Sequence, residues 1–301
     1  GDMLAALGLR YGTDKATDFS VKVHRTLAVE AYRASTLMAV ERGAFPIYDS
    51  KREDDNPFIS RLREADPEMY GEMVKHGRRN IALLTIAPTG STSLMSQTTS
   101  GIEPVFMPFY KRRRKVNPND KDVSVTFIDD VGDHWEEFMV FHHKFIDWMK
   151  VNGYDFNEVS SMTESQIKAI VARSPYYKAT ANDVDWVAKV RMQGAIQKWV
   201  DHSISVTINL PAEVKEELVS ELYLTAWKEG CKGATVYRDG SRAGVLVSNS
   251  KEEKKKEWSP VRPKVLEADV IRFQNNEEKW IAFVGLKDGI PYEIFTGLQD
   301  D

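Results

Sequence analysis

Hydrophobic residues along this chain recur with two periods, one typical of helices and one typical of strands. The first long helical repeat predicts a helix over residues 18–42 that stops before Gly43. Its apolar positions are Phe19, Val23, Leu27, Tyr32 and Leu37. A continuous apolar run at 81–87, IALLTIA, instead predicts a strand with both faces covered.

Residues 109–153 combine a basic segment with an aromatic one. The segment FYKRRRKVNPNDKDVSVTFIDD predicts two strands around an Asn-Pro-Asn-Asp turn. The aromatic segment at 133–153 predicts a helix that ends at Gly153. A further helix is predicted from NDVDWVAKVRMQGAIQKWVDHSIS, where Asn182 or Asp183 is placed to cap its start.

The pattern then alternates strand, helix and strand. SVTINLP predicts a strand that Pro211 ends, AEVKEELVSELYLTAWKEG predicts an amphipathic helix that closes on Gly230, and GATVYR predicts the next strand. This order is typical of parallel βα units, so we predict an α/β fold over residues 1–246. A charged, Pro-containing linker follows at 247–263. Residues 264–301 alternate around Asn-Asn and Asp-Gly turns and predict a small antiparallel β unit.

Composition places the chain among ordinary globular proteins. Its 301 residues suffice for one large domain or two smaller ones, and 42% of them are apolar and 29% charged. The formal net charge of -4 disfavours general nucleic-acid binding. No apolar run approaches the roughly 18 residues of a membrane span, and no signal peptide is recognisable. With a single cysteine, these features predict a cytoplasmic protein.

The most informative stretch is LLTIAPTGSTSLMSQTTSGIEP. Nine of the twelve residues after Pro88 are Gly, Ser or Thr. A loop of small residues between a strand and a helix can bind an anion, because backbone N–H groups, hydroxyls and the helix dipole all favour a phosphate there. The segment lacks the Lys of a P-loop, so it is not a Walker site. By residue type alone, a polar turn that caps a helix is the simpler interpretation.

Longer motifs change this interpretation. APTGSTSLMSQTTSGIEPVF resembles the phosphate-binding segment of the ribonucleotide reductase large chain in its adenosylcobalamin-dependent (class II) form. YKRRRKVNPND, HWEEFMVFHHKF, MQGAIQKWVDHSISVTINLP and WKEGCKGATVYRDGSR resemble the same family in the same order. DMLAALGLRYGTD and AYRASTLMAVERGAFP also fit. RFQNNEEKWIAFVGLKDGIPYEIFTG resembles the C-terminal extension of long class II chains, so the resemblance covers essentially the whole sequence.

The resemblance implies a fold and a chemistry. The fold is a ten-stranded α/β barrel of two half-barrels around a finger loop, and this chain would be the second half-barrel plus the extension. The activity is reduction of ribonucleotides, diphosphates in the extended members, to deoxyribonucleotides for DNA synthesis. A cysteine thiyl radical generated from adenosylcobalamin acts on the ribose, and a thioredoxin-like reductant serves the complete enzyme. By resemblance, the substrate phosphates would be bound by Pro88, Thr89, Gly90, Ser91, Thr92 and Ser93.

The three chemical cysteines of that family have no counterparts here. The radical cysteine lies in an Asn-x-Cys-x-Glu type segment, which this sequence lacks, and the redox pair needs two thiols where the chain has only Cys231. The chain also starts inside an apolar segment, GDMLAALGLRYG. We therefore expect a fragment or a split subunit that is inactive alone. Its partner would be an N-terminal half, in the same chain or as a separate subunit.

Cys231 and the histidines are weak candidates for catalytic or metal-binding residues. Cys231 precedes a predicted strand and is better explained as a small buried hydrophobe than as a reactive thiol. His142 and His143 are adjacent, so on a helix their side chains point about 100° apart and do not share a metal-binding face. His202 has no supporting motif. The sequence therefore predicts no metal ligand and no catalytic residue in this chain.

The remaining polar candidates are weaker. YKRRRK could be a nucleic-acid patch, but Lys and Arg also protect edge strands, and the net charge favours the second explanation. Glu103 could be a general acid or base, or a residue that orders the pocket. Ser205 and Asn209 are candidate pocket-lining residues, because barrel strands end at the active face.

Two hypotheses remain. In the first, the chain is the C-terminal half of a class II reductase and supplies the phosphate loop. In the second, it is a non-catalytic nucleotide-binding or interaction module that uses the β extension to dock partners, as the missing cysteines suggest. A half-barrel would leave unpaired edges and apolar surface, so we expect self-association, a homodimer included.

Overall fold

The computed structural model describes residues 1–116, 125–128, 134–241, 264–275 and 278–299. The chain divides into two compact units. The first comprises Gly1–Arg112 and Phe138–Ser248, and the second comprises Arg113–Glu137 and Asn249–Asp301. The predicted linker at 247–263 and the predicted Asn-Pro-Asn-Asp turn lie outside the described residues.

The first unit contains the long helix α2 (Asp14–Arg42), which confirms the helix predicted at 18–42. It starts earlier than predicted because the Thr13 hydroxyl accepts a hydrogen bond from the N–H of Ala16 and caps the first turn. Gly43 ends the helix with a φ of 77°, a backbone angle that glycine adopts without a steric penalty.

The buried face of α2 differs from the predicted one. Leu27 and Leu37 are 53% and 62% exposed. The helix instead buries Tyr32 and a row of small residues, which let neighbouring helices approach closely. These small residues are Ala16, Ser20, Ala28, Ser35 and Ala39. The other elements of this part are α1 (Asp2–Ala6), a 3-10 turn η1 (Ser50–Glu53), α3 (Pro57–Ala65) and α4 (Pro67–His76).

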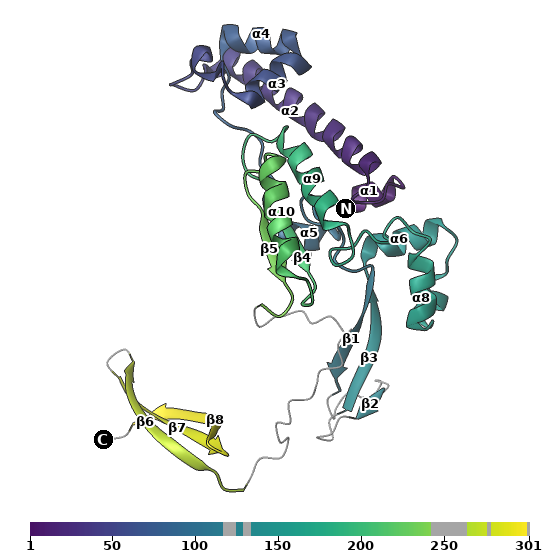
Figure 1. Cartoon of the computed structure of the whole chain (residues 1–301), viewed down its shortest axis with the longest axis vertical. Coiled ribbons are helices and arrows are strands. Elements are labelled where there is room, and N and C mark those ends of the chain that lie inside the picture. The colour runs from purple at the N-terminus through teal and green to yellow at the C-terminus, as the bar shows by residue number, and fades with distance from the viewer. Residues whose placement is uncertain (117–124, 129–133, 242–263, 276–277, 300–301) are drawn as a thin grey trace. The chain divides into compact units, whose positions relative to one another are not determined.

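A strand–helix–strand unit follows the prediction. Strands β4 (Thr207–Leu210) and β5 (Thr235–Arg238) pair in parallel, and α10 (Glu216–Lys228) connects them. Figure 1 shows α10 beside this pair, next to α9 (Trp186–Gln197). A Cβ at Gly194 of α9 would lie 2.8 Å from the Glu229 carbonyl oxygen, so only glycine allows this close packing. The cap of α9 is Asp185 rather than the predicted Asn182 or Asp183.

The strand predicted at 81–87 is largely absent. The segment is extended, but its pairing is reduced to an isolated parallel bridge between Ile86 and Ile204. Ile81 is 61% exposed, so the segment is not covered on both faces. The Asp201 carboxylate accepts hydrogen bonds from the N–H groups of Leu83 and Leu84, which a neighbouring strand would otherwise bind. A second parallel bridge joins Val105 to Thr180.

The prediction for residues 109–153 was wrong in two respects. Strand β3 (His134–Phe141) occupies the first part of the predicted helix, which is confined to α6 (His143–Val151). Strands β1 (Phe109–Lys115) and β2 (Phe127–Ile128) do not pair with each other, because β3 lies between them. Arg113 and Arg114 form ion pairs with Glu137 and Glu136 of β3. Cross-strand charge pairs and aromatic residues thus outweigh the helical spacing.

Two short helices complete the first unit after α6. They are α7 (Phe156–Ser160) and α8 (Glu164–Val171). Phe145, Met149 and Ile167 are fully buried in the apolar cluster that joins α6 to these helices.

The second unit contains the antiparallel sheet that the C-terminal pattern predicted. Strands β6 (Glu267–Asn275), β7 (Glu278–Lys287) and β8 (Ile290–Leu298) pair in the order of the sequence. Asp288 and Gly289 both have positive φ, 55° and 76°, as two-residue hairpin turns require.

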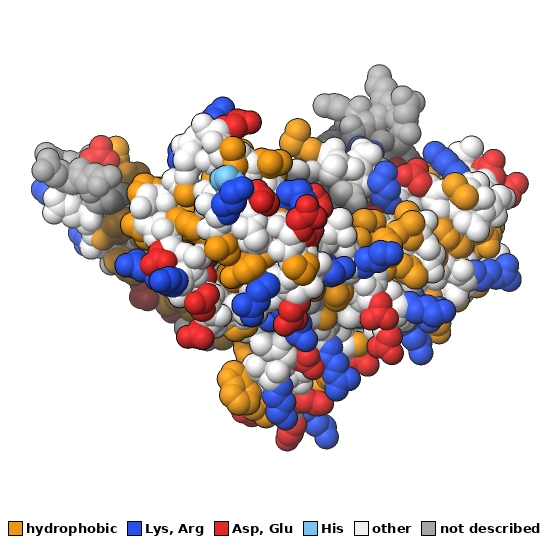
Figure 2. Space-filling view, turned by 90° about the horizontal axis from the view of Figure 1, so that it is seen from above, with side chains coloured by type: hydrophobic (Ala, Val, Ile, Leu, Met, Phe, Trp, Pro, Cys, Tyr) orange, Lys and Arg blue, Asp and Glu red, His pale blue; other side chains and the backbone are white. Residues whose placement is uncertain are grey.

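Several large apolar side chains of the first unit remain exposed. Leu94 is 80% exposed, Met95 is 87% exposed and Trp227 is 77% exposed. Hydrophobic side chains also appear among interspersed acidic and basic ones on the face shown in Figure 2. Exposed apolar area of this kind favours association.

We therefore expect the isolated chain to self-associate in a concentration-dependent way, as measured by light scattering. The triple variant Leu94→Ser, Met95→Ser, Trp227→Ser should lower the average mass without unfolding the chain, because exposed positions contribute little to stability. A stable monomer across the accessible concentration range would contradict this expectation.

Candidate functional site

Residues 88–93 form a tight turn into the short helix α5 (Gly90–Ser96). Thr89 is left-handed, with φ 39° and ψ 27°, and its hydroxyl accepts a hydrogen bond from the N–H of Gly101 at 3.1 Å. The N–H of Ser93 donates to the Thr89 carbonyl at 2.9 Å. No described backbone carbonyl accepts from the three preceding N–H groups, those of Gly90, Ser91 and Thr92. These donors are therefore available to a ligand.

The hydroxyl groups of the loop have different surroundings. Ser93 is buried, and its hydroxyl donates to the Gly90 carbonyl at 2.7 Å and lies 3.0 Å from the Ser100 hydroxyl. Ser91 and Thr92 are exposed. A Cβ added at Gly90 would meet no protein atom within 4 Å. The Ser93 hydroxyl thus stabilises the turn from the buried side. The side chains of Ser91 and Thr92 are exposed, and the space beside Gly90 is open.

The start of the loop is held by the segment 203–205. The N–H of Ser205 donates to the Ile86 carbonyl at 2.8 Å, and the N–H of Ile86 donates to the Ser203 carbonyl at 3.3 Å. Upstream, the Asp201 carboxylate accepts the N–H groups of Leu83 and Leu84 at 2.7 and 2.8 Å. This ladder directs the chain into Pro88.

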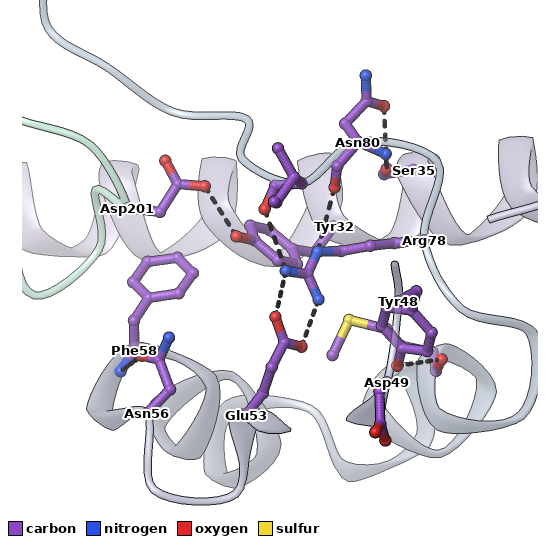
Figure 3. A network of polar contacts seen from close by, with 12 residues as sticks. Tyr32, Ser35, Tyr48, Asp49, Glu53, Asn56, Phe58, Arg78, Asn80 and Asp201 are labelled. Atoms are coloured by element: carbon purple, nitrogen blue, oxygen red, sulfur yellow. Dashed lines mark hydrogen bonds and ion pairs between the residues drawn. The ribbon is translucent and has the colours of Figure 1, made fainter. Parts of the chain in front are cut away.

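A buried network around Arg78 anchors the same segment to α2 (Figure 3). Arg78 is 2% exposed and donates to both carboxylate oxygens of Glu53 at 2.6 Å. It also donates to the carbonyl of Ile81 at 3.0 Å. The Tyr32 hydroxyl donates to Asp201 at 2.7 Å. Burial favours the neutral form of Arg78. The Glu53 carboxylate, together with Tyr32 and Tyr48, outweighs this effect, so the pKa of Arg78 is raised.

The segment that follows the loop and α5 is held by Glu103. One carboxylate oxygen accepts the N–H of Thr207, the first residue of β4, at 2.6 Å. The other accepts the ammonium of Lys189 at 2.7 Å. Lys189 is 1% exposed and also donates to the Thr207 carbonyl at 2.6 Å. Burial lowers the pKa of Lys189, and the Glu103 carboxylate opposes that shift.

The far side of the loop is held by Asp2 of α1. Its carboxylate accepts the N–H of Thr99 at 2.8 Å and the Thr98 hydroxyl at 3.0 Å. The Tyr176 hydroxyl donates to it at 2.9 Å, and Nε2 of His142 lies 2.9 Å from both of its oxygens. Burial opposes ionisation of Asp2, but the contacts with His142 and the two hydroxyls lower its pKa. Asp2 therefore acts as an ionised anchor.

The predicted pocket-lining residues lie at different places. Ser205 is exposed and adjacent to Ile86, which brings it next to the start of the loop. Asn209 is half-buried in β4 and paired in register with Tyr237 of β5, and its side-chain amide nitrogen lies 3.4 Å from the Thr207 carbonyl oxygen. Ser205 thus joins the loop, whereas no described contact connects Asn209 to it.

The sequence matches the family described as "Ribonucleotide reductase, barrel domain" over residues 1–237. The chain belongs to the ribonucleotide reductase family. A second match, "NrdJ homologue C-terminal domain", covers residues 266–301. The α/β fold is therefore of the ribonucleotide reductase type, and the loop at 88–93 lies within the matched barrel region.

Curated relatives carry the same family name. A "Vitamin B12-dependent ribonucleoside-diphosphate reductase" of Mycobacterium tuberculosis is 32% identical over 253 residues, which is 82% of this chain and 30% of the relative. One of Thermoplasma acidophilum is 29% identical over 267 residues, or 86% of this chain and 30% of the relative. This chain spans about three-tenths of the length of these relatives.

A solved structure, the Actinobacillus ureae class Id ribonucleotide reductase alpha subunit, aligns with 79% of this chain and 37% of its own chain. Its TM-score is 0.49 and its sequence identity is 17%.

The surroundings of Cys231 in this reductase-family chain disfavour the thiolate form. It lies between α10 and β5, is half-buried against the apolar cluster beneath β4, and its Sγ is 3.9 Å from the Val190 carbonyl. Burial, together with the charge of Glu229, raises its pKa to about 11. Since the thiolate is the reactive form, this thiol is suited to packing.

In the described part of the chain, no group of three or more His, Cys, Asp or Glu side chains could hold a metal ion. His142 lies before α6, not within it, and its ring contacts Asp2. Of the helices that the structure describes, none combines the length and apolar character needed to cross a membrane.

Several residues that shape the loop were not singled out from the sequence. Asp2, Lys189 and Asp201 are charged, and each has a partner in the segment 83–103 that is more than 80 residues away in the chain. One signal was available within α9. Lys189, Gln193 and Gln197 recur every four residues in α9, and all three are buried, whereas Arg191 of the same helix is exposed. A polar stripe inside such a helix indicates buried hydrogen bonds.

Proposed function

We propose that this chain is the phosphate-binding C-terminal part of a vitamin B12-dependent ribonucleoside-diphosphate reductase. The observation that carries the proposal is the loop at 88–93. This loop has three consecutive N–H groups at the start of a helix, and the hydroxyls of Ser91 and Thr92 are exposed beside them. The space in front of Gly90 is open. Such donors suit the oxygens of a nucleotide phosphate.

In this proposal the loop binds the nucleotide phosphates and positions the substrate. Pro88 and Thr89 set the turn, Gly90 to Thr92 donate to phosphate oxygens, and Ser93 braces the loop from beneath. Ser205, beside the start of the loop, and Asn209, on β4, line the pocket. Reduction of the ribose needs more thiols than the single Cys231, so those groups belong to a part of the enzyme outside this sequence.

The complete enzyme would have the following organisation. Residues 1–246 form the second half of a ten-stranded barrel, residues 247–263 a linker and residues 264–301 a β extension. An N-terminal half, in the same chain or a separate subunit, supplies the radical cysteine. In this proposal a thioredoxin-like protein re-reduces the complete enzyme. The enzyme is cytoplasmic and forms a homodimer.

Adenosylcobalamin supplies the initiating radical in such an enzyme. Three cavities lined by described residues are each too small to enclose it. The three described cavities measure about 530, 10 and 520 Å³. Sites for drug-sized ligands measure roughly 300–1,000 Å³, and the corrin macrocycle with its nucleotide is larger than such ligands. We therefore assign no cobalamin contact to this chain and derive no step through the cofactor.

Binding of a nucleoside diphosphate tests the proposal. Calorimetric titration of the chain with ADP should show saturable binding, and Gly90→Ala should weaken it at least tenfold, because the methyl group occupies the space in front of the loop. The double variant Ser91→Ala, Thr92→Ala should weaken it at least tenfold, since even one hydrogen bond to a charged group contributes about 1.5–3 kcal/mol.

The matched control is Gly71→Ala in α4. Like Gly90, Gly71 has no atom within 4 Å of an added Cβ and no positive φ, so both variants should fold. Gly71→Ala should bind ADP like the unmodified chain. No saturable ADP binding, or equal binding by the Gly90 and Gly71 variants, would contradict the proposed site.

The lone cysteine favours a second candidate, a non-catalytic nucleotide-binding module. Mixing the chain with an N-terminal half that carries the Asn-x-Cys-x-Glu segment, adenosylcobalamin and a dithiol separates the two. Ribonucleotide reduction that falls sharply in the Ser91→Ala, Thr92→Ala variant supports the enzyme component. ADP binding without reduction by any N-terminal partner supports the module.

A further inference from the structure

We propose that Glu103 is the positioning residue of the 88–93 loop, with Lys189 as its buried counter-charge. The inference rests on the proposed function, because it assigns to Glu103 the task of holding the phosphate donors in place. It adds a residue outside the loop to the binding machinery.

The segment 86–103, which contains the loop, is attached at both ends to one continuous segment, 203–207. The start is hydrogen-bonded to Ser203 and Ser205, and the end is bonded through Glu103 to Thr207. A segment clamped at both ends has a defined span, so the N–H groups of the loop keep a defined direction. Without Glu103, the end would lose its attachment to β4.

The buried charge of Lys189 keeps Glu103 in place. Lys189 is 1% exposed, and its ammonium contacts the Glu103 carboxylate at 2.7 Å and the Thr207 carbonyl at 2.6 Å. An isolated buried ammonium is strongly unfavourable. The carboxylate therefore cannot move toward solvent without leaving Lys189 unpaired. Lys189 holds Glu103 against β4, and Glu103 holds the end of the segment 86–103.

The contacts of the Glu103 carboxylate favour positioning over catalysis. Oε1 of Glu103 accepts the N–H of Thr207, and Oε2 accepts from Lys189. Both oxygens are thus engaged within the described structure, whereas a general base needs an oxygen directed at the proton it removes. Of the two roles considered from the sequence, these contacts favour the ordering one.

The experiment compares Glu103→Gln with a charge-balanced double variant. The amide oxygen introduced by Glu103→Gln can still accept the N–H of Thr207, but the amide nitrogen then presents its N–H groups to the Lys189 ammonium. We expect Glu103→Gln to weaken ADP binding about tenfold. The double variant Glu103→Gln, Lys189→Met removes the buried charge together with its bond to the Thr207 carbonyl, but keeps the bond from the Thr207 N–H to residue 103. Binding should therefore return to within about threefold of the unmodified chain.

Ile167→Ala in α8 is the stability control, because it destabilises a separate apolar cluster of the first unit. Hydrogen exchange provides a second measurement that does not require a ligand. The amides of Ser93 and Gly101, which donate within the loop, should lose protection in Glu103→Gln and keep it in Ile167→Ala. A general loss of stability would affect both variants alike.

The outcomes distinguish the two proposals. If the unmodified chain does not bind ADP, the proposed function fails, while hydrogen exchange still tests whether Glu103 orders the loop. If the chain binds ADP and Glu103→Gln binds equally well with full protection of the loop, the role of Glu103 is overturned. Failure of the double variant to recover would overturn the role of Lys189 as counter-charge.

Discussion

Replacing Glu53 by Ala is expected to destabilise the first unit by about 3–5 kcal/mol, because it leaves a buried guanidinium without its carboxylate. The Arg78 side chain is 3% exposed, and both of its terminal nitrogens donate to Glu53 at 2.6 Å. Tyr32, Phe45 and Tyr48 surround it at 5.3–5.7 Å, and these ring faces compensate only part of the loss. Urea denaturation followed by circular dichroism measures the change, since the described helices all lie in the first unit.

Two variants sharpen this expectation. Arg52→Ala removes a neighbouring but exposed partner of Asp49 and should cause no comparable loss. The double variant Glu53→Leu, Arg78→Met replaces the pair by apolar groups and should be far less destabilised than Glu53→Ala. A loss below about 1 kcal/mol for Glu53→Ala would show that the pair is not a buried ionic anchor.

The second large effect is expected for Asp201→Ala. The variant removes the acceptor of the Tyr32 hydroxyl and of the N–H groups of Leu83 and Leu84. Each buried donor left unsatisfied costs about 1–3 kcal/mol, so the total should reach roughly 3 kcal/mol or more. Because the segment 83–86 directs the chain into the loop, ADP binding should weaken as well. Urea denaturation and hydrogen exchange at Leu84 and Ser205 measure the two effects.

Tyr32→Phe is the matched control for Asp201→Ala. It removes only the phenolic hydroxyl of the network and keeps both backbone bonds to Asp201, so its loss should be near 1 kcal/mol. The amides of Leu84 and Ser205 should remain protected in this variant. Equal losses of stability and protection in the two variants would show that Asp201 does not hold the segment.

The successes of the sequence prediction share a local cause. Helix α2, the unit β4–α10–β5 and the sheet β6–β8 all followed from periodicity together with nearby turn or cap residues. The wrong prediction at residues 134–141 has a non-local cause. His134–Phe141 has spacing compatible with a helix, but its acidic residues pair with Arg113 and Arg114 on β1, which the sequence order does not reveal.

The candidate loop was predictable in kind but not in detail. Gly, Ser and Thr after an extended segment indicated a helix start with available N–H groups, and α5 begins at Gly90. Residue type could not show that Ser93 turns inward while Ser91 and Thr92 remain exposed. That difference depends on packing against Ser100, on the other side of the turn.

The sequence by itself determined helix α2, the unit β4–α10–β5, the C-terminal sheet and the family of this chain, and it predicted a candidate loop at residues 88–93. These properties depend on residues close together in the chain or on long contiguous motifs. Only the tertiary structure decided what holds the loop. Glu103 meets Lys189 across 86 positions, and Asp2 meets His142 across 140. Such pairs form because a buried charged or polar group needs a partner, and no local pattern specifies which partner it will meet.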